Sequence, residues 1–312
     1  MSKVIEVKKL NKSYGRTKVL DNLSFEVEKG EILGLLGPNG SGKTTTINSI
    51  LSLLNYESGS IKIMGENMTP DSFNIKKNIG VIFQDVAVFD ELNVFDNVDY
   101  FCGLYIKDKK ERRDCVQEAL KLVGLEAYKK YTPKQLSGGL LRRLNIACGI
   151  AHKPSIIFFD EPTVAVDPQS RNNILEGIEA LRDKGATIIY TTHYMEEVEI
   201  LCDRIIILDK GVILASGTSD ELKELANIDE KITVEGIEVG KKVLDELNNN
   251  KNVDEVHLQK NTLKVTYKKG KNNLVELMDL LKKYKVKYSS LYSEKPTLND
   301  VFLSLTGKEL RD

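Results

Sequence analysis

The segment Gly37-Pro38-Asn39-Gly40-Ser41-Gly42-Lys43-Thr44 fits the pattern GxxxxGK[ST] in full. It follows an apolar run, Ile32–Leu36, with the character of a buried strand, and precedes residues 43–54, which have the character of a helix. In this pattern glycines let backbone N–H groups approach phosphate oxygens, and the next helix adds its positive dipole end. Lys43 supplies a charge for the β- and γ-phosphates, and the Thr44 hydroxyl can bind Mg²⁺. We therefore expect a nucleotide-binding loop at the edge of an α/β sheet.

A second segment, Ile156-Ile157-Phe158-Phe159-Asp160-Glu161, ends an apolar run with two acids. Four apolar residues predict a buried strand, and ligands of open α/β sheets bind at the carboxyl ends of the strands. We expect Asp160 to hold the Mg²⁺ shell and Glu161 to polarise an attacking water. Alone, the segment would be read as a strand ending in two solvated acids; beside a phosphate loop, the functional interpretation is favoured.

The composition excludes several classes of protein. The chain has 312 residues, enough for about two domains, and its 45 Lys and Arg against 46 Asp and Glu give a formal net charge of −1. This balance gives no electrostatic case for nucleic acid, and no nucleic-acid partner is expected. The four cysteines and three histidines lack the spacing of a zinc site or a disulfide framework. No signal peptide is recognised, and no apolar run approaches the ~18 residues of a transmembrane helix.

The order of the predicted elements divides the chain near residue 226. Strands are expected at residues 4–8, 23–28 and 32–36, and short apolar runs at 80–83, 156–159, 187–191 and 205–208 are expected to form buried parallel strands. Residues 85–136 are interpreted as a mostly helical insert, with a helix over 108–124 that stops at Gly124. Residues 1–226 are therefore expected to form one domain and residues 227–312 an accessory domain.

The accessory domain has the pattern of a ferredoxin-like fold. Strands are expected at residues 231–235, 253–258, 263–267 and 286–291, and helices at 240–249 and 273–284, giving the order β-α-β-β-α-β. A last helix should open at Thr297 with a capping-box spacing, in which Asp300 replaces the preferred Glu or Gln.

The tetrapeptide Leu136-Ser137-Gly138-Gly139 lies between the phosphate loop and the apolar-Asp-Glu strand. The three motifs in this order resemble the ATP-binding cassette (ABC) ATPases over residues 1–225. The resemblance implies a P-loop NTPase cassette of α/β class with a helical subdomain. It also implies that two cassettes close head to tail, with each ATP between the phosphate loop of one and the signature of the other. Ser137, at a helix start, suits such a phosphate contact.

Further residues take their expected roles from the same resemblance. Tyr14 matches the aromatic residue that stacks on adenine, and Gln84 matches the glutamine that senses Mg²⁺ and joins the helical insert. Val164-Ala165-Val166-Asp167 resembles the D-loop, which crosses to the partner cassette, and His193 matches the switch histidine at the γ-phosphate. Leu140 departs from the family, which usually has glutamine there, and the D-loop sequence is also unusual.

The resemblance implies a set of site residues, ATP as the nucleotide and Mg²⁺ as the metal. The expected catalytic residues are Glu161, His193 and Gln84, and the expected metal ligands are Thr44, Gln84 and Asp160. The expected nucleotide contacts are Tyr14, Gly37, Pro38, Asn39, Gly40, Ser41, Gly42, Lys43, Thr44, Thr45, Ser137, Gly138, Gly139 and Asp167.

Two functions of ABC ATPases compete. The first is the ATP-hydrolysing subunit of a transporter, and the second is a soluble ATPase acting on ribosomes or nucleic acid. A short helical insert and a single cassette favour the first, with a separate multi-span permease and a second copy of this chain, or a homologous cassette, as partners. The chain would then lie on the cytoplasmic side of the cell membrane, held there by the permease.

The end of the chain, Pro296-Thr297-Leu298-Asn299-Asp300-Val301-Phe302-Leu303, resembles bacterial ABC-2-type exporter ATPases of the daunorubicin-resistance type. A ferredoxin-like fold also occurs in RNA-binding RRM domains, which stack bases on exposed aromatic side chains of the central strands. The central strands here lack aromatics except Tyr267, and residues 228–312 carry 16 Lys and Arg against 14 Asp and Glu. We therefore interpret this domain as an interaction or regulatory module.

Overall fold

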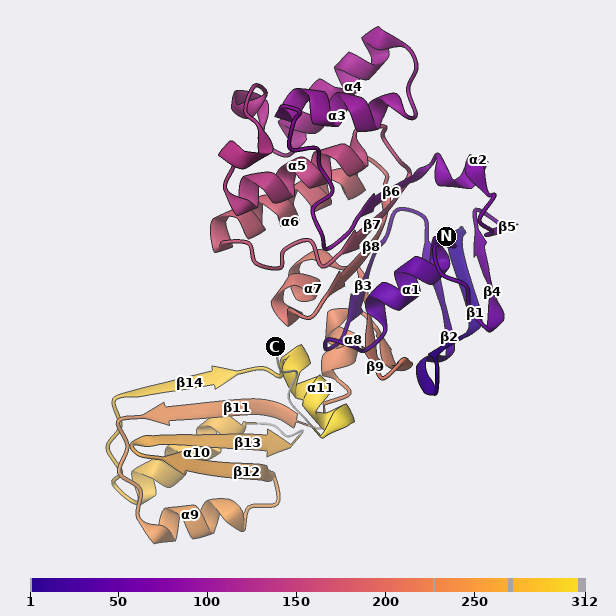
Figure 1. Cartoon of the computed structure of the whole chain (residues 1–312). Coiled ribbons are helices and arrows are strands. Elements are labelled where there is room, and N and C mark those ends of the chain that lie inside the picture. Colours follow the sequence, from indigo (N-terminus) through magenta and orange to yellow (C-terminus); the bar gives the residue numbers. More distant parts are fainter. Residues whose placement is uncertain (1, 227, 269–271, 308–312) are drawn as a thin grey trace. The chain divides into compact units, whose positions relative to one another are not determined.

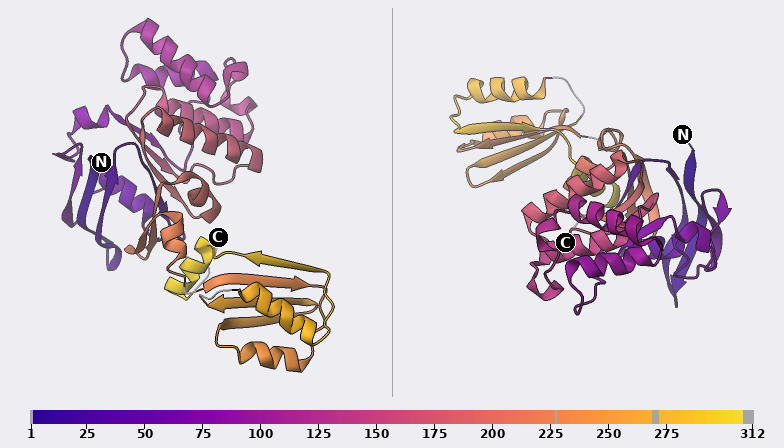
Figure 2. Two further views of the ribbon diagram at one scale, coloured as in Figure 1. Left: turned by 180° about the vertical axis from the view of Figure 1, so that it is seen from behind. Right: turned by 90° about the horizontal axis from the view of Figure 1, so that it is seen from above.

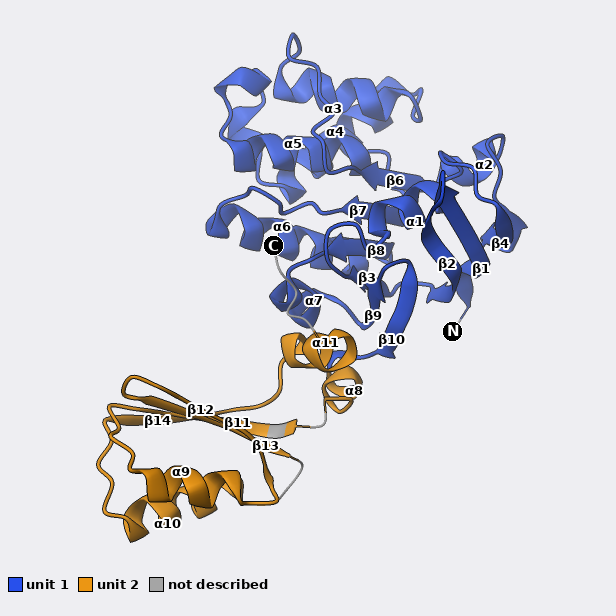
Figure 3. Ribbon diagram, turned by 60° about the horizontal axis from the view of Figure 1, so that its bottom comes forward, with its two compact units in different colours: residues 1–219, 311–312 blue, residues 220–310 orange. Residues whose placement is uncertain are grey.

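The computed structural model describes residues 2–226, 228–268 and 272–307 (Figure 1). The described residues form two compact units, one within residues 2–219 and the other within residues 220–307 (Figure 3). The boundary expected near residue 226 thus falls earlier, since α8 (Ser219–Lys223), whose Leu222 is buried, lies almost entirely in the second unit. No helix in the described ranges has the length and hydropathy needed to cross a membrane.

The first unit is built on a six-stranded sheet with the order β10-β9-β3-β8-β7-β6. Five neighbouring strands run parallel, and β10 lies antiparallel at the edge. The strands are β3 (Ile32–Leu36), β6 (Ile79–Ile82), β7 (Ile156–Asp160), β8 (Thr187–Thr192), β9 (Arg204–Asp209) and β10 (Val212–Gly217). The expected α/β fold with buried parallel strands is therefore confirmed.

Both faces of this sheet are covered, because successive strand residues point to opposite sides. In β7, Ile156 and Phe158 join a core with helix α1 (Lys43–Ile50), whereas Ile157 and Phe159 join a core with the helices on the other face. Each such side chain stabilises the fold by roughly 1.5–3 kcal/mol when fully buried. The helical layer on the second face consists of α3 (Val94–Gly103), α4 (Lys109–Leu122), α5 (Gly138–Ile150) and α6 (Pro168–Asp183), and Leu201 also joins its core.

A four-stranded antiparallel sheet, ordered β2-β1-β4-β5, lies on the other side of α1. Its strands are β1 (Lys3–Tyr14), β2 (Thr17–Glu28), β4 (Ser58–Ile63) and β5 (Glu66–Asn67). The sequence predicted parts of β1 and β2 but missed β4 and β5. The β1–β2 ladder continues well beyond the predicted strands by way of register shifts.

Residues 85–136 contain α3, α4 and two 3₁₀ helices, η1 (Glu126–Tyr128) and η2 (Pro133–Gln135). Helix α4 begins where expected, because the Asp108 side chain accepts hydrogen bonds from the N–H groups of Lys110 and Glu111. It ends before Gly124, whose φ of 66° is a conformation that glycine adopts readily.

The second unit has the expected ferredoxin-like sheet, ordered β12-β13-β11-β14, with α9 and α10 on one face (Figure 2). Its elements are β11 (Ile228–Glu235), α9 (Lys241–Asn248), β12 (Val253–Gln259), β13 (Thr262–Lys268), α10 (Asn273–Lys283), β14 (Ser290–Glu294) and α11 (Leu298–Thr306). The capping box at Thr297 forms, and its Asp300 also pairs with Lys231. That second partner gives a reason for aspartate at a position where Glu or Gln is usual.

Two predicted boundaries were wrong for identifiable reasons. Helix α1 ends at Ile50 rather than 54, because Ser52 takes a left-handed φ of 53°. Strand β14 begins at Ser290 rather than 286, because the Val286 N–H donates to the Leu281 carbonyl and closes the end of α10. Lys285 has a φ of 53° at that turn.

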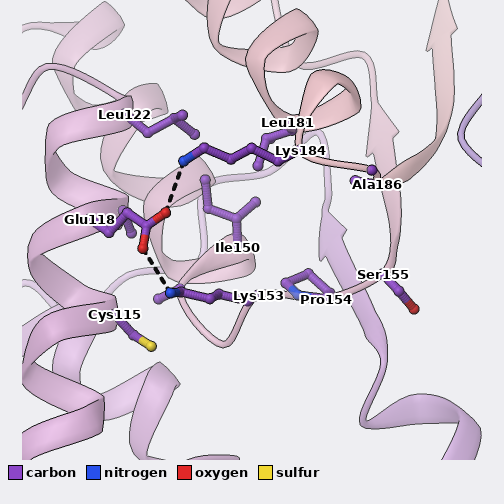
Figure 4. A pocket seen from close by; sticks show the side chains of 13 residues that line it. Cys115, Glu118, Leu122, Ile150, Lys153, Pro154, Ser155, Leu181, Lys184 and Ala186 are labelled. Carbon is purple, nitrogen blue, oxygen red and sulfur yellow. Dashed lines mark hydrogen bonds and ion pairs between the residues drawn. The ribbon is translucent and has the colours of Figure 1, made fainter.

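One ion-pair cluster connects α4 to the ends of α5 and α6 (Figure 4). The Glu118 carboxylate pairs with Lys153 Nζ at 2.7 Å and with Lys184 Nζ at 2.9 Å, beside a cavity of about 280 Å³. The hydrogen bonds from Lys153 and Lys184 lower the pKa of Glu118 to about 2. The cluster thus ties α4 to the ends of α5 and α6 at the exposed edge of the helical layer.

We expect Glu118→Gln to lower the free energy of unfolding by about 0.5–1 kcal/mol at pH 7, because all three side chains are partly solvated. The folded pKa of about 2 lies below the unfolded value of about 4.3. The stabilisation is therefore complete above about pH 4.3 and is lost as the pH falls through about 2. Urea unfolding should show the difference between the two proteins narrowing from pH 7 to about pH 3.

The control is Glu176→Gln, which removes an exposed carboxylate of α6 for which the described residues give no ion pair. This variant should match the parent protein at both pH values. A gap for Glu118→Gln that stays constant with pH would contradict the assignment of the stabilisation to the Glu118 charge.

Candidate nucleotide-binding site

The phosphate loop connects β3, all of whose residues are buried, to α1. Gly42 caps α1 with a φ of 107° and no side-chain hydrogen bond, which leaves the first N–H groups of the helix without a side-chain cap. A Cβ at Gly37 would lie 2.1 Å from the Leu208 carbonyl oxygen, so only glycine fits there. The Ser41 hydroxyl is buried with no hydrogen-bond partner in the described structure. The loop therefore presents unsatisfied donors, which suits an anionic ligand.

Lys43 is held in a buried position inside this loop. Its Nζ donates to the carbonyl oxygens of Gly37 at 2.7 Å and Pro38 at 3.2 Å, and it lies 3.0 Å from Glu161 Oε1. The side chains of Lys43 and Glu161 are 4% and 6% exposed. The two sequence motifs, far apart in the chain, are thus joined directly by an ion pair.

The acids at the end of β7 are fixed by β8. The Thr191 hydroxyl donates to Asp160 Oδ1 at 2.6 Å and accepts from the Glu161 N–H at 3.0 Å. Burial raises the pKa of Asp160, and hydrogen bonds from Thr191 and Thr44 oppose that rise. Because Mg²⁺ prefers carboxylate and hydroxyl oxygens, this Asp160–Thr44 pair is a donor set that fits it.

His193, which directly follows β8, completes the cluster. Its Nδ1 lies 3.4 Å from Glu161 Oε2, and its side chain is 8% exposed. The carboxyl ends of β3, β7 and β8 thus bring together Lys43, Asp160, Glu161 and His193. In this arrangement a carboxylate and an imidazole face one another beside a phosphate loop.

The predicted signature residues begin α5 and pack against α6. The Ser137 hydroxyl caps α5 by accepting from the Leu140 N–H at 3.3 Å. A Cβ at Gly138 would meet nothing within 4 Å, whereas one at Gly139 would lie 2.2 Å from Ser170 Oγ. No hydrogen bond or ion pair of the described residues joins Ser137, Gly138 or Gly139 to the phosphate loop of the same chain.

Gln84 is exposed, and its backbone rather than its side chain is fixed. The buried guanidinium of Arg142 donates to the carbonyl oxygens of Phe83 at 2.9 Å and Gln84 at 2.6 Å. Asn145 Oδ1 accepts from the Ala87 N–H at 3.0 Å. Helix α5 therefore holds the segment after β6 from its buried face. Arg142 and Asn145 were not predicted to have a role. Their positions could have indicated one, because both are polar residues at core-facing positions of an otherwise apolar helix.

The remaining predicted contacts lie at the edges of the cluster. Tyr14 ends β1 and is 52% exposed, with Lys12 Nζ 5.1 Å from its ring centre. Asp167 caps α6 by accepting from the Ser170 N–H at 2.9 Å. Thr45 follows Thr44 in the first turn of α1 and is half-buried. Among the described residues, no hydrogen bond or ion pair joins Tyr14 to Lys43 or Glu161.

Two family models match the chain. The one described as ABC transporter matches residues 20–164, and the one described as ATP-binding protein DrrA1-3-like, C-terminal domain, matches residues 217–306. The second match begins close to the start of the second unit.

Relatives match over the same span. The linearmycin resistance ATP-binding protein LnrL of Bacillus subtilis (strain 168) is 36% identical over 99% of this chain and 100% of its own length. The daunorubicin resistance ATP-binding protein DrrA3 of Streptomyces coeruleorubidus is 31% identical over 98% of this chain and 97% of its own. Among solved structures, the dimeric post-hydrolysis cassette MJ0796 with ADP and Pi is 28% identical, with a TM-score of 0.63, over 69% of this chain and 98% of that one. Since the likeness runs through both units, the protein belongs to the family of ATP-binding subunits of ABC transporters, and it is an ATPase.

Proposed function

We propose that the chain hydrolyses ATP between two cassettes to drive export by a separate membrane subunit. The observation that carries this proposal is the buried contact of Lys43, Glu161 and His193 beside the phosphate loop. Relatives of nearly the same length are named as resistance ATP-binding proteins for linearmycin and daunorubicin, which supports an exporter.

In this proposal the phosphate loop and Lys43 bind the β- and γ-phosphates, and Tyr14 stacks on adenine. Thr44 and Asp160 hold Mg²⁺, with Gln84 reaching it when the cassette closes. Bound there, Mg²⁺ would neutralise charge on the phosphates as the leaving oxygen departs.

Glu161 is the proposed base, and its ion pair with Lys43 determines when it can act. Its carboxylate is paired with Lys43, so phosphate oxygens must replace Glu161 at the Lys43 ammonium before Glu161 can polarise a water. His193, on the opposite carboxylate oxygen, would then contact the γ-phosphate. ATP binding thus prepares the base that acts on it.

The second half of each site would come from another cassette. Ser137 and Gly138 are exposed at the N-terminus of α5, where backbone N–H groups and the helix dipole favour a phosphate. The solved cassette MJ0796, similar over most of the first unit, is described as dimeric with ADP and Pi. We propose a head-to-tail pair, formed by two copies or by this chain and a homologous cassette, with Asp167 near the shared boundary.

A permease would dock on the helical layer. Exposed apolar side chains gather there on α3 and on the segments before and after it: Phe83, Val86, Phe89, Tyr100, Leu104 and Tyr105. Several of them line a groove of about 210 Å³ with Ala87 and Phe101. Because Arg142 ties the segment after β6 to α5, the groove is mechanically joined to the signature helix. The chain would be held in this way at the cytoplasmic side of the membrane.

The alternative function, a soluble ATPase acting on ribosomes or nucleic acid, finds no support. Tyr267 is buried against the helices of the second unit rather than exposed for base stacking. On the opposite face of that sheet, Lys264 of β13 is paired in register with His257. On this face the described residues of the central strands β11 and β13 include no aromatic side chain, whereas an RRM stacks bases on aromatic residues of its central strands.

We expect Lys43→Ala to reduce ATP affinity by at least about tenfold, because the ammonium contributes charge-assisted bonds to the phosphates. Isothermal titration of the full chain with ATP measures this. Lys76→Ala, which removes a half-buried lysine whose Nζ donates to the Pro70 carbonyl, should bind like the parent. Unchanged affinity for Lys43→Ala would refute the phosphate-loop assignment.

Glu161→Gln should abolish turnover while leaving ATP binding intact, since the amide cannot accept a proton from water. The variant should therefore accumulate as an ATP-bound dimer, measured by light scattering on a sizing column with ATP and with ADP. A monomer under saturating ATP would contradict the shared-site proposal. Lys43→Ala in the same background should remain monomeric.

A further inference from the structure

The first turn of α6 contacts two of the proposed motif segments through consecutive residues. Ser170 packs against the signature residue Gly139, where an added Cβ would lie 2.2 Å from Ser170 Oγ. Arg171, the next residue, reaches Tyr194, which directly follows His193; its guanidinium carbon lies 4.5 Å from the Tyr194 ring centre. Asp167, which caps α6, belongs to the D-loop segment. One rigid turn therefore connects the signature helix to the segment that carries His193.

A buried carboxylate fixes the other end of that segment. Glu197 of α7 (Met195–Leu201) is 2% exposed, and its Oε2 accepts from the hydroxyls of Tyr190 at 2.8 Å and Thr192 at 2.7 Å. The Thr192 hydroxyl in turn accepts from the Tyr194 N–H at 2.9 Å. The backbone on both sides of His193 is thus held through Glu197.

The Arg171 guanidinium and the Glu197 carboxylate face one another at a distance longer than that of a charge-assisted hydrogen bond. Arg171 Nε lies 3.5 Å from Glu197 Oε1, and neither atom has a hydrogen-bond partner in the described structure. Burying an acid whose second oxygen lacks a hydrogen bond is costly, so the pair is unlike one selected for stability alone. A small shift of α6 would convert the contact into a charge-assisted hydrogen bond.

We propose that Arg171 and Glu197 are positioning residues that transmit the placement of the signature helix and the D-loop to His193 within one cassette. The His193 ring lies 4.1 Å from the Tyr194 ring, so a displacement of Tyr194 by Arg171 moves the imidazole relative to Glu161. When a second cassette engages the signature helix and the D-loop, α6 carries that change to the switch histidine. This inference rests on the proposed role of His193.

The test uses the full chain and steady-state ATP hydrolysis. Arg171→Ala should lower kcat by about tenfold or more with KM for ATP within about twofold, because the described contacts of Arg171 are with Glu197 and Tyr194 rather than with the phosphate loop. Arg182→Ala is the matched control: it lies on the same helix with similar side-chain exposure and pairs with Asp203 instead. It should keep the parent kcat.

A double variant separates positioning from a merely structural role. If Arg171 acts through His193, Arg171→Ala combined with His193→Ala should be no slower than His193→Ala alone in a single-turnover assay. Glu197→Gln keeps an oxygen acceptor for the Tyr190 and Thr192 hydroxyls but removes the charge facing Arg171. It should therefore reproduce the loss of kcat without a lower thermal midpoint.

Two results would overturn the inference: Arg171→Ala matching Arg182→Ala, or a double variant slower than His193→Ala by the full factor of Arg171→Ala. If instead His193→Ala itself keeps the parent kcat, the proposed role of His193 fails, and the inference fails with it. These outcomes are distinguishable because His193→Ala is measured on its own.

Discussion

The parallel pairing of β3, β7 and β8 is the constraint on which the rest of the molecule depends. Lys43, Glu161 and His193 are far apart in the chain, yet each follows the carboxyl end of one of these three adjacent strands. The pairing holds because alternate residues of the strands fill two separate cores, one against α1 and one against the helical layer. A shift of one residue in β7 would exchange Phe158 with Phe159 and also move Asp160 and Glu161.

The buried charges at the carboxyl edge of the sheet contribute little to the stability of the fold. A buried pair such as Lys43–Glu161 costs several kcal/mol per ion in lost solvation, which its own attraction only partly offsets. Asp160, whose pKa burial raises, and the unpartnered hydroxyl of Ser41 follow the same pattern. In the proposed function the triphosphate of ATP would supply partners for the Lys43 ammonium and the Ser41 hydroxyl, and Mg²⁺ would supply one for the Asp160 carboxylate.

The sequence singled out Lys43, Glu161 and His193, which the structure brings together, but not the contacts that hold the segments around them. The pattern from Ile32 to Thr44 was sufficient to predict the glycine loop between a strand and a helix, because the three are adjacent in the chain. Arg142, Arg171 and Glu197 could not be found in this way, since their partners are brought near only by tertiary packing. Leu140, a departure from the family, packs against the core of the helical layer, a contact that a single sequence does not reveal.

The predicted ends of helices and strands were wrong where the conformation of a single turn determined the end. Helix α1 ends where Ser52 adopts a φ of 53°, and α10 ends where the Val286 N–H donates a hydrogen bond to the Leu281 carbonyl. Neither feature can be recognised from the amino-acid composition of the segment. Ferredoxin-like order was predictable in the second unit because apolar residues alternate along β11 and β13 and recur with helical spacing in α10.

In the proposed function, ATP-driven closure of this cassette acts on a separate membrane protein. The most direct measurement is affinity purification of tagged Glu161→Gln from detergent-solubilised membranes, with mass spectrometry of the bound proteins and with Leu104→Glu in the same background as the docking control. The account predicts a stoichiometric multi-span membrane protein that is lost with Leu104→Glu. Ribosomal or DNA-associated partners without a membrane subunit would contradict it.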